Sequence, residues 1–197
     1  SIVAYYGTGY ATVVSDLEQD GHYYFKLFTQ RNNRTFSDGI VTDGTTLDCT
    51  IDEWQTEDFE NYSINSTPDC WSGTWTVGNV DGQKALVSPA GTYNPNRYWQ
   101  QSTSHPILFD TIVSRIIHYH TRFLAGCDSQ SRLKVELQTS PYADWGTIDT
   151  LSWSDNLDGW VDRYIIVDNT GNYSRLRFSS FTNGTDRIAV DDIEFVT

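Results

Sequence analysis

Hydrophobic and polar residues alternate along this chain in short runs, which is the pattern of half-buried β-strands. Four such runs are HYYFKLFTQ (residues 22–30), RLKVELQTS (132–140), DRYIIVD (162–168) and YSRLRFSSF (173–181). The run DTIVSRIIHYHTRFLAG (110–126) comes nearest to a helix, but it is rich in β-branched and aromatic residues and lacks caps, so it predicts a long strand. Gly, Asn and Asp turns separate the runs. Regularly spaced short strands predict an all-β sandwich.

The run DRIAVDDIEF near the end of the chain departs from simple alternation. Ile188 and Val190 share one face of the predicted strand, and Asp192 should follow them toward the interior. The apolar pattern resumes on the other face at Ile193, so its phase changes at Asp191–Asp192. Either a β-bulge lies at this point, or the fold requires an aspartate inside.

Composition and charge narrow the possible classes of protein. The 197 residues suit one large domain, or a medium domain with an appendage, and they carry a net charge of −13. A chain this acidic repels phosphate backbones, which argues against nucleic acid as a partner. No apolar run is long enough to span a membrane, which argues against membrane insertion. The acidity suits an extracellular protein and a protein that binds cations.

The chain divides near residue 50, and its first part resembles the back half of a fibronectin type III domain. The resemblance rests on Leu17, on Tyr23 six residues later, and on the alternating Phe25 and Leu27. In that family the tyrosine makes a corner that holds a strand against the preceding loop. We therefore expect a partial fibronectin-like segment at residues 1–48, a linker at 49–54 and a second domain at 55–197.

Half a sandwich would expose an apolar face and unpaired strand edges, which are unstable in water. We expect residues 1–48 to be ordered only through contacts outside that segment. Residues upstream of this chain, the second domain, or another copy of the protein could provide them. The last possibility would allow self-association through the N-terminal segment.

The second part resembles the jelly rolls of the MAM, cleaved-adhesin and choice-of-anchor families. Asp58-Phe59-Glu60 matches the opening D-F-E of these domains, Trp160 matches the tryptophan of a late strand, and residues 188–193 match the closing I-A-x-D-D-I. The resemblance runs from Glu57 to Phe195. It implies an extracellular, non-catalytic jelly-roll module. It also implies that Trp145, Trp153 and Trp160 belong to the core.

The resemblance also implies a structural calcium ion. In such a jelly roll the opening and closing strands lie side by side, which would bring Asp58 and Glu60 near Asp191–Asp192. Clustered carboxylates repel one another, and Ca²⁺ resolves the repulsion because it takes six to eight oxygen ligands. We expect Asp192 and Glu60 as ligands, then Asp58, with Asp81 in the turn GNVDGQ as a more distant candidate. The alternative is a solvated acidic edge with a bulge at Asp191.

Three cysteines, Cys49, Cys70 and Cys127, lie far apart without any C-x-x-C pair, so they do not indicate a zinc site. One disulfide and one free thiol suit a secreted protein. We expect the disulfide between Cys70 and Cys127, because both lie in the larger domain.

The other candidate chemistry is sparse. His118 and His120 place two imidazoles on one strand face, a spacing that metals use, but no third ligand is evident and two histidines on a sheet surface are ordinary. There is no G-x-S-x-G, no H-E-x-x-H and no glycine-rich phosphate loop. The sequence therefore predicts no enzymatic activity.

Aromatic residues supply the remaining functional signal. Tyr93, Tyr98 and Trp99 lie in the polar stretch AGTYNPNRYWQQ. Exposed rings there could stack on sugars or anchor a protein partner, or Trp99 could begin a strand and be buried.

The features together predict an extracellular or cell-surface adhesion module that recognises a glycan or a protein. An alternative is a subunit of a filament, surface layer or virion whose first domain is completed by a strand from a neighbour. A third possibility is an accessory domain that docks a catalytic partner to its substrate.

Overall fold

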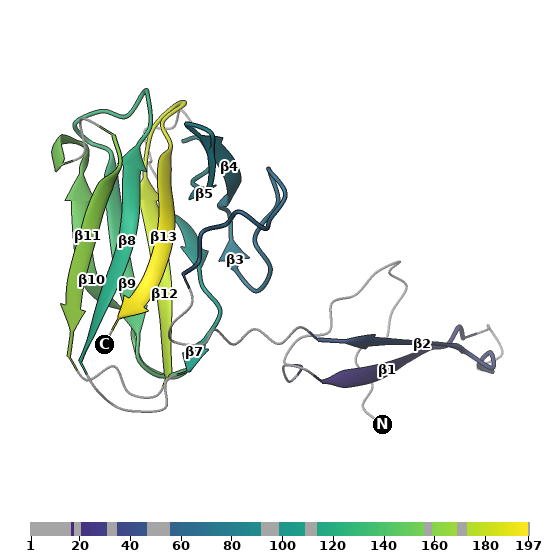
Figure 1. Cartoon of the computed structure of the whole chain (residues 1–197). Coiled ribbons are helices and arrows are strands. Elements are labelled where there is room, and N and C mark those ends of the chain that lie inside the picture. Colours follow the sequence, from purple (N-terminus) through teal and green to yellow (C-terminus); the bar gives the residue numbers. More distant parts are fainter. Residues whose placement is uncertain are drawn as a thin grey trace. The chain divides into compact units, whose positions relative to one another are not determined.

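The computed structural model describes Leu17 and residues 21–30, 35–46, 56–91, 99–108, 114–155, 159–168 and 173–196. The chain forms two compact units, Ser1–Cys49 and Thr50–Thr197, and the division falls within residues 49–54, where a linker was predicted. Figure 1 shows the hairpin of the first unit and the sandwich of the second. Among the described residues no helix is long and apolar enough to cross a membrane.

The described part of the first unit is a two-stranded antiparallel hairpin. Strand β1 (His22–Leu27) pairs with β2 (Ile40–Thr45), so that His22 faces Thr45 and Leu27 faces Ile40. Within this unit Tyr23 and Phe25 are half-buried, whereas several large apolar side chains are exposed: Tyr24, Leu27, Phe28, Phe36, Ile40 and Val41. The rest of the predicted fibronectin-like segment lies mostly outside the described residues, and that resemblance stays a prediction.

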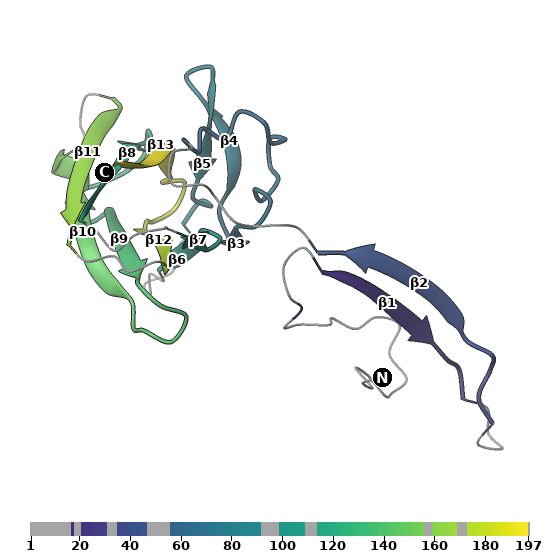
Figure 2. The ribbon, with the colours of Figure 1, turned by 60° about the horizontal axis from the view of Figure 1, so that its bottom comes forward.

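The second unit consists of two facing antiparallel sheets, seen end-on in Figure 2. In one sheet the strand order is β10-β9-β12-β6-β3, with β7 paired to β12, and in the other it is β11-β8-β13-β5-β4. From β8 onward the chain changes sheets repeatedly, as a jelly roll does. The predicted all-β sandwich is confirmed. The strands are β3 (Ser72–Gly73), β4 (Thr76–Val80), β5 (Gln83–Val87), β6 (Gln100–Thr103), β7 (Ile107–Leu108), β8 (Arg115–Phe123), β9 (Arg132–Gln138), β10 (Gly146–Ser152), β11 (Val161–Val167), β12 (Tyr173–Phe181) and β13 (Ile188–Val196).

The core lies between the two sheets, because every second residue of each long strand points inward. Its largest fully buried apolar side chains include Trp75, Tyr119, Phe59 and Phe178. The Tyr119 hydroxyl donates a 2.8 Å hydrogen bond to Asp149 Oδ2. Burial, followed by the charge of Asp149, raises the pKa of Tyr119, so the phenol stays neutral and the core contains a satisfied polar group.

Strand β13 contains both a β-bulge and a buried aspartate, which the sequence offered as alternatives. Asp191 faces His120 on β8, the pairing resumes only with Glu194 opposite His118, and Asp192 between them has a left-handed φ of 47°. This is a β-bulge, and aspartate is among the few non-glycine residues that adopt such a conformation. Asp191 is buried, with 4% exposure, and Asp192 is half-buried, while Ile193 after the bulge packs in the core. The expectation that Asp192 points inward was therefore wrong, because the extra residue changes which side chain faces the interior.

The cysteines also differ from the prediction. Cys70 is disulfide-bonded, but Cys127 is a free thiol buried in the core of the second unit, so the predicted Cys70–Cys127 disulfide is wrong. The Cys127 thiol donates to the carbonyl of Arg187 at 3.2 Å, and burial raises its pKa to about 11. Cys127 therefore behaves as a small buried hydrophobic residue. The third cysteine, Cys49, lies outside the described residues.

Candidate functional site

The outer face of strands β9 and β12 carries a cluster of basic side chains. Leu133 and Val135 of β9 and Leu176 and Phe178 of β12 point into the core, so the residues between them point outward. We call these outward positions the basic face, because they carry four of the 13 Lys and Arg residues of the chain and one carboxylate. They are Arg132, Lys134, Arg175, Arg177 and Glu136.

Glu136 holds the centre of the basic face in place. Its Oε1 accepts from Lys134 Nζ at 3.0 Å, and its Oε2 accepts from Arg177 Nε at 2.8 Å and from Ser179 Oγ at 3.1 Å. Burial alone would raise the pKa of Glu136, but hydrogen bonds from Arg177 and Lys134 outweigh it and hold the pKa below its usual value. Glu136 is only 4% exposed, so these donors compensate its desolvation and fix both cations in one orientation.

Two tryptophans accompany these cations. Lys134 Nζ lies 4.9 Å from the ring centroid of Trp99, and Arg177 Cζ lies 4.3 Å from that of Trp145. The Trp99 ring also contacts Phe181, with the centroids 5.4 Å apart, and it remains 42% exposed. Trp99 is thus a surface residue, as the ligand-binding interpretation requires.

The other predicted aromatic sites have mixed outcomes. Tyr93 and Tyr98 lie outside the described residues. Trp153 and Trp160 pack against the core, as the resemblance implied. Trp145 does not belong to either core cluster and stacks under Arg177, so the expectation of a core role for Trp145 was wrong. Trp145 immediately precedes the first residue of β10, Gly146.

Three of the four predicted calcium ligands, Asp58, Glu60 and Asp192, lie where the opening segment meets the closing strand, whereas Asp81 lies in the turn between β4 and β5. Glu57 and Ile193 form a β-bridge with two backbone hydrogen bonds, of 2.8 and 3.0 Å. Burial, followed by the charges of Asp192, Glu60 and Asp58, raises the pKa of Asp191 to about 7. Asp191, Asp192, Glu60 and Asp58 therefore share one region of strong negative potential.

Each predicted calcium ligand also has a contact of its own. Glu60 Oε1 accepts from the Lys84 N–H at 2.7 Å, and Asp58 Oδ1 accepts from the Glu60 N–H at 3.1 Å. Asp81 forms an ion pair with Arg122, and Asp192 Oδ2 lies 2.8 Å from His120 Nδ1. The calcium ion remains a prediction.

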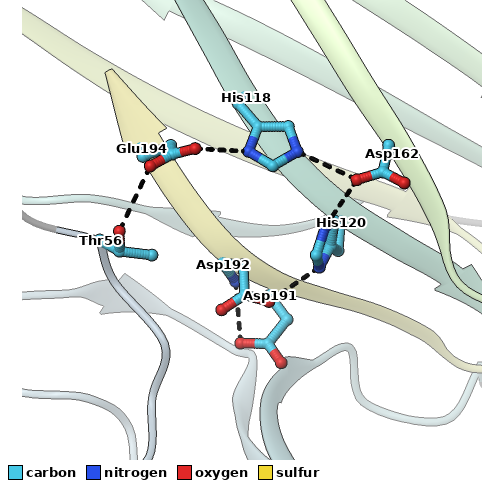
Figure 3. A network of polar contacts seen from close by, with 7 residues as sticks. All are labelled: Thr56, His118, His120, Asp162, Asp191, Asp192 and Glu194. Carbon is cyan, nitrogen blue, oxygen red and sulfur yellow. Dashed lines mark hydrogen bonds and ion pairs between the residues drawn. The ribbon is translucent and has the colours of Figure 1, made fainter. Parts of the chain in front are cut away.

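Residues of two neighbouring strands form a third cluster. His118 and His120 on β8 and Asp162 on β11 bring their possible ligand atoms within 4.8 Å of one another, and within the described ranges no other three His, Cys, Asp or Glu residues come this close (Figure 3). The sequence did not reveal Asp162 as a third ligand, because it lies 42 residues from His120 and only the strand pairing places the two opposite each other. The basic face, by contrast, has a local signal in the alternating charges of RLKVE and SRLR.

Comparison with known proteins shows the fold but no family. No protein-family model and no curated protein matches the chain. Among solved structures, the K1 cleaved adhesin domain of Lys-gingipain from Porphyromonas gingivalis W83 is similar with a TM-score of 0.53 at 11% identity, over 72% of this chain and 96% of that domain. The K2 cleaved adhesin domain of Lys-gingipain is similar with a TM-score of 0.53 at 14% identity, over 73% of this chain and 99% of that domain.

A family 29 carbohydrate-binding module aligns with a TM-score of 0.46 at 10% identity, over 73% of this chain and 91% of that module. At these identities the two adhesin-domain matches confirm a jelly-roll fold of the cleaved-adhesin type for the second unit. The resemblances to MAM and choice-of-anchor domains stay predictions.

Proposed function

We propose that this chain is a non-catalytic binding module of an extracellular or cell-surface protein, and that its basic face binds glycans that carry acidic groups. The observation that carries the proposal is the combination, on one sheet surface, of four basic side chains, one buried carboxylate and two tryptophans. The cleaved-adhesin-type fold of the second unit supports the same function class.

The chemistry of the basic face suits a sugar with carboxylate or sulfate groups. The chain as a whole carries a net charge of −13, so a surface with four cations and one carboxylate differs in sign from the rest of the protein. Lys134 and Arg177 can donate charge-assisted hydrogen bonds to an acidic group, while Glu136 holds them in position. The exposed part of Trp99 offers an apolar surface for the C–H face of a sugar ring.

The test compares binding of the purified chain to polygalacturonate and to neutral galactan by affinity electrophoresis and calorimetry. We expect binding to the acidic polymer alone, weakened by salt because the contacts are exposed charges. Lys134→Gln and Trp99→Ala should each weaken binding at least about tenfold, the cost of one charge-assisted or aromatic contact.

Arg122→Gln is the matched control, because Arg122 lies on the opposite sheet and its side chain is 27% exposed against 26% for Lys134. It should bind as the unaltered protein does. Equal binding to both polymers, no binding to either, or equal effects of Lys134→Gln and Arg122→Gln would contradict the proposal.

A structural calcium ion at the junction of the opening and closing strands is part of the proposed function. Asp191 is buried and surrounded by the charges of Asp192, Glu60 and Asp58, an arrangement that is costly without a cation. Carboxylate oxygens are the ligands that Ca²⁺ prefers. These four residues would hold the ion, and its effect would be to stabilise the fold, since no ligand-binding role follows from its position.

The exposed side chains of the hairpin favour a second candidate function, assembly of several copies of the chain. Both β1 and β2 carry large exposed apolar residues, among them Leu27, Ile40 and Val41. The two strands described in this unit would bury too little area to be stable by themselves. A neighbouring copy could add a strand to this sheet and cover the exposed apolar side chains.

A further inference from the structure

Two imidazoles converge on one carboxylate at the surface of the sheet that contains β8. In the pairing of β8 with β11, His120 faces Asp162 and His118 faces Tyr164. Asp162 Oδ1 lies 2.7 Å from His120 Nε2 and 3.1 Å from His118 Nε2. Both Nε2 atoms therefore point toward the same oxygen, as Figure 3 shows.

The opposite nitrogen of each imidazole is held by a second carboxylate from β13. His118 Nδ1 lies 2.7 Å from Glu194 Oε1, and His120 Nδ1 lies 2.8 Å from Asp192 Oδ2. In metal sites a carboxylate commonly accepts the N–H of a ligating histidine, which leaves its other nitrogen free to bind the metal. Glu194 and Asp192 occupy that position here, one for each histidine.

The histidines are also fixed by packing. The His118 ring stacks on Tyr164, with centroids 4.3 Å apart and planes 11° from parallel, and it meets the His120 ring edge-on at 5.1 Å. The His118 side chain is 10% exposed and that of His120 is 30% exposed, whereas Asp162 is 59% exposed. With two packed imidazoles and one exposed carboxylate at the rim, an ion could enter from solvent and displace Asp162 slightly outward.

We infer that His118, His120 and Asp162 bind a divalent transition-metal ion, with zinc as the best-suited metal, and that Glu194 and Asp192 position the two imidazoles. Zinc accepts imidazole nitrogen and carboxylate oxygen at about 2.0–2.2 Å in a tetrahedron with edges of about 3.3 Å. The two N–O separations here are 2.7 and 3.1 Å, and all three ligand atoms lie within 4.8 Å of one another, so small shifts of the side chains would complete the geometry. Imidazole ligands disfavour calcium and magnesium, which take oxygen. Three protein ligands leave the fourth position for water or for a group from a partner.

The test uses the full chain, free of any histidine tag, after chelation and dialysis. Calorimetry with zinc chloride should show one equivalent bound. Cobalt(II) loading should give the strong visible absorption of tetrahedral coordination. His120→Gln and Asp162→Asn should abolish the cobalt spectrum, and Glu194→Gln should weaken zinc binding at least about tenfold, as expected for a positioning carboxylate.

His22→Gln is the matched control, because His22 Nε2 lies 2.8 Å from Asp43 Oδ2 in an ordinary pair without a second histidine. It should leave both measurements unchanged. The inference would be overturned if zinc did not bind, if cobalt gave only the weak spectrum of octahedral coordination, or if a folded His120→Gln variant bound zinc as tightly as the unaltered chain. If that variant failed to fold, the cobalt spectrum of the unaltered chain would decide the question.

Discussion

His105, between β6 and β7, should make the stability of this protein depend on pH. It is 7% exposed, and its imidazole meets the Trp71 ring edge-on with centroids 6.5 Å apart. None of the described protein groups hydrogen-bonds to its Nδ1. Burial, followed by the positive charge of Arg175, lowers the pKa of His105 from 6.5 to about 4. The folded protein therefore keeps this imidazole neutral where the unfolded chain would protonate it.

The sign and size of the effect follow from that difference in pKa. Between pH 6.5 and about 4 the unfolded chain binds a proton at His105 that the folded protein excludes, so acidification favours unfolding. The stabilisation is fully present above pH 6.5 and is lost as the pH falls to about 4. A difference of this size corresponds to about 3 kcal/mol, since each pKa unit is worth about 1.4 kcal/mol.

The perturbation is His105→Leu, which removes the titrating group and the buried Nδ1 together. Urea unfolding, followed by tryptophan fluorescence in chelator, should give variant and unaltered protein similar free energies of unfolding at pH 7.5. At pH 4 the variant should be more stable by about 3 kcal/mol, less any packing loss already seen at pH 7.5. Other titrating groups occur in both proteins and cancel in the comparison.

Parallel curves of unfolding free energy against pH for His105→Leu and the unaltered chain would refute the reasoning. They would show that His105 is protonated as easily in the folded as in the unfolded state.

Two further predictions concern calcium and assembly. Millimolar calcium should raise the melting temperature, because an ion that binds only the folded state stabilises it. Asp58→Asn keeps an acceptor for the Glu60 N–H and should lose most of that rise. A melting temperature that changes with neither calcium nor chelator would count against the site. If copies of the chain complete the hairpin, sedimentation velocity should show association that grows with concentration and disappears in Ile40→Asp, whereas a monomer at every concentration would remove the assembly alternative.

Much of the fold could be read locally. Strand β12 coincides with the run YSRLRFSSF, β8 lies inside the run predicted as a long strand, and β13 overlaps the run DRIAVDDIEF and ends one residue beyond it. Alternation of apolar and polar residues depends only on neighbours in the chain. The sandwich class followed from the same pattern. The alternating charges of β9 and β12 likewise indicate the basic face in the sequence. The sequence does not show that Trp99 and Trp145 lie beside it.

The tertiary structure decided which distant residues meet. A single bulge in β13 determined that Ile193 and not Asp192 packs in the core, and Cys127 is a free thiol buried in that core. The three metal-ligand candidates come together only because β11 pairs with β8 in one particular register, which places Asp162 opposite His120. Such registers arise from the packing of whole sheets on a shared core, and shifting one by a residue would turn every side chain to the opposite face. The sequence by itself therefore determined the strands and their faces, while sheet packing determined the sites.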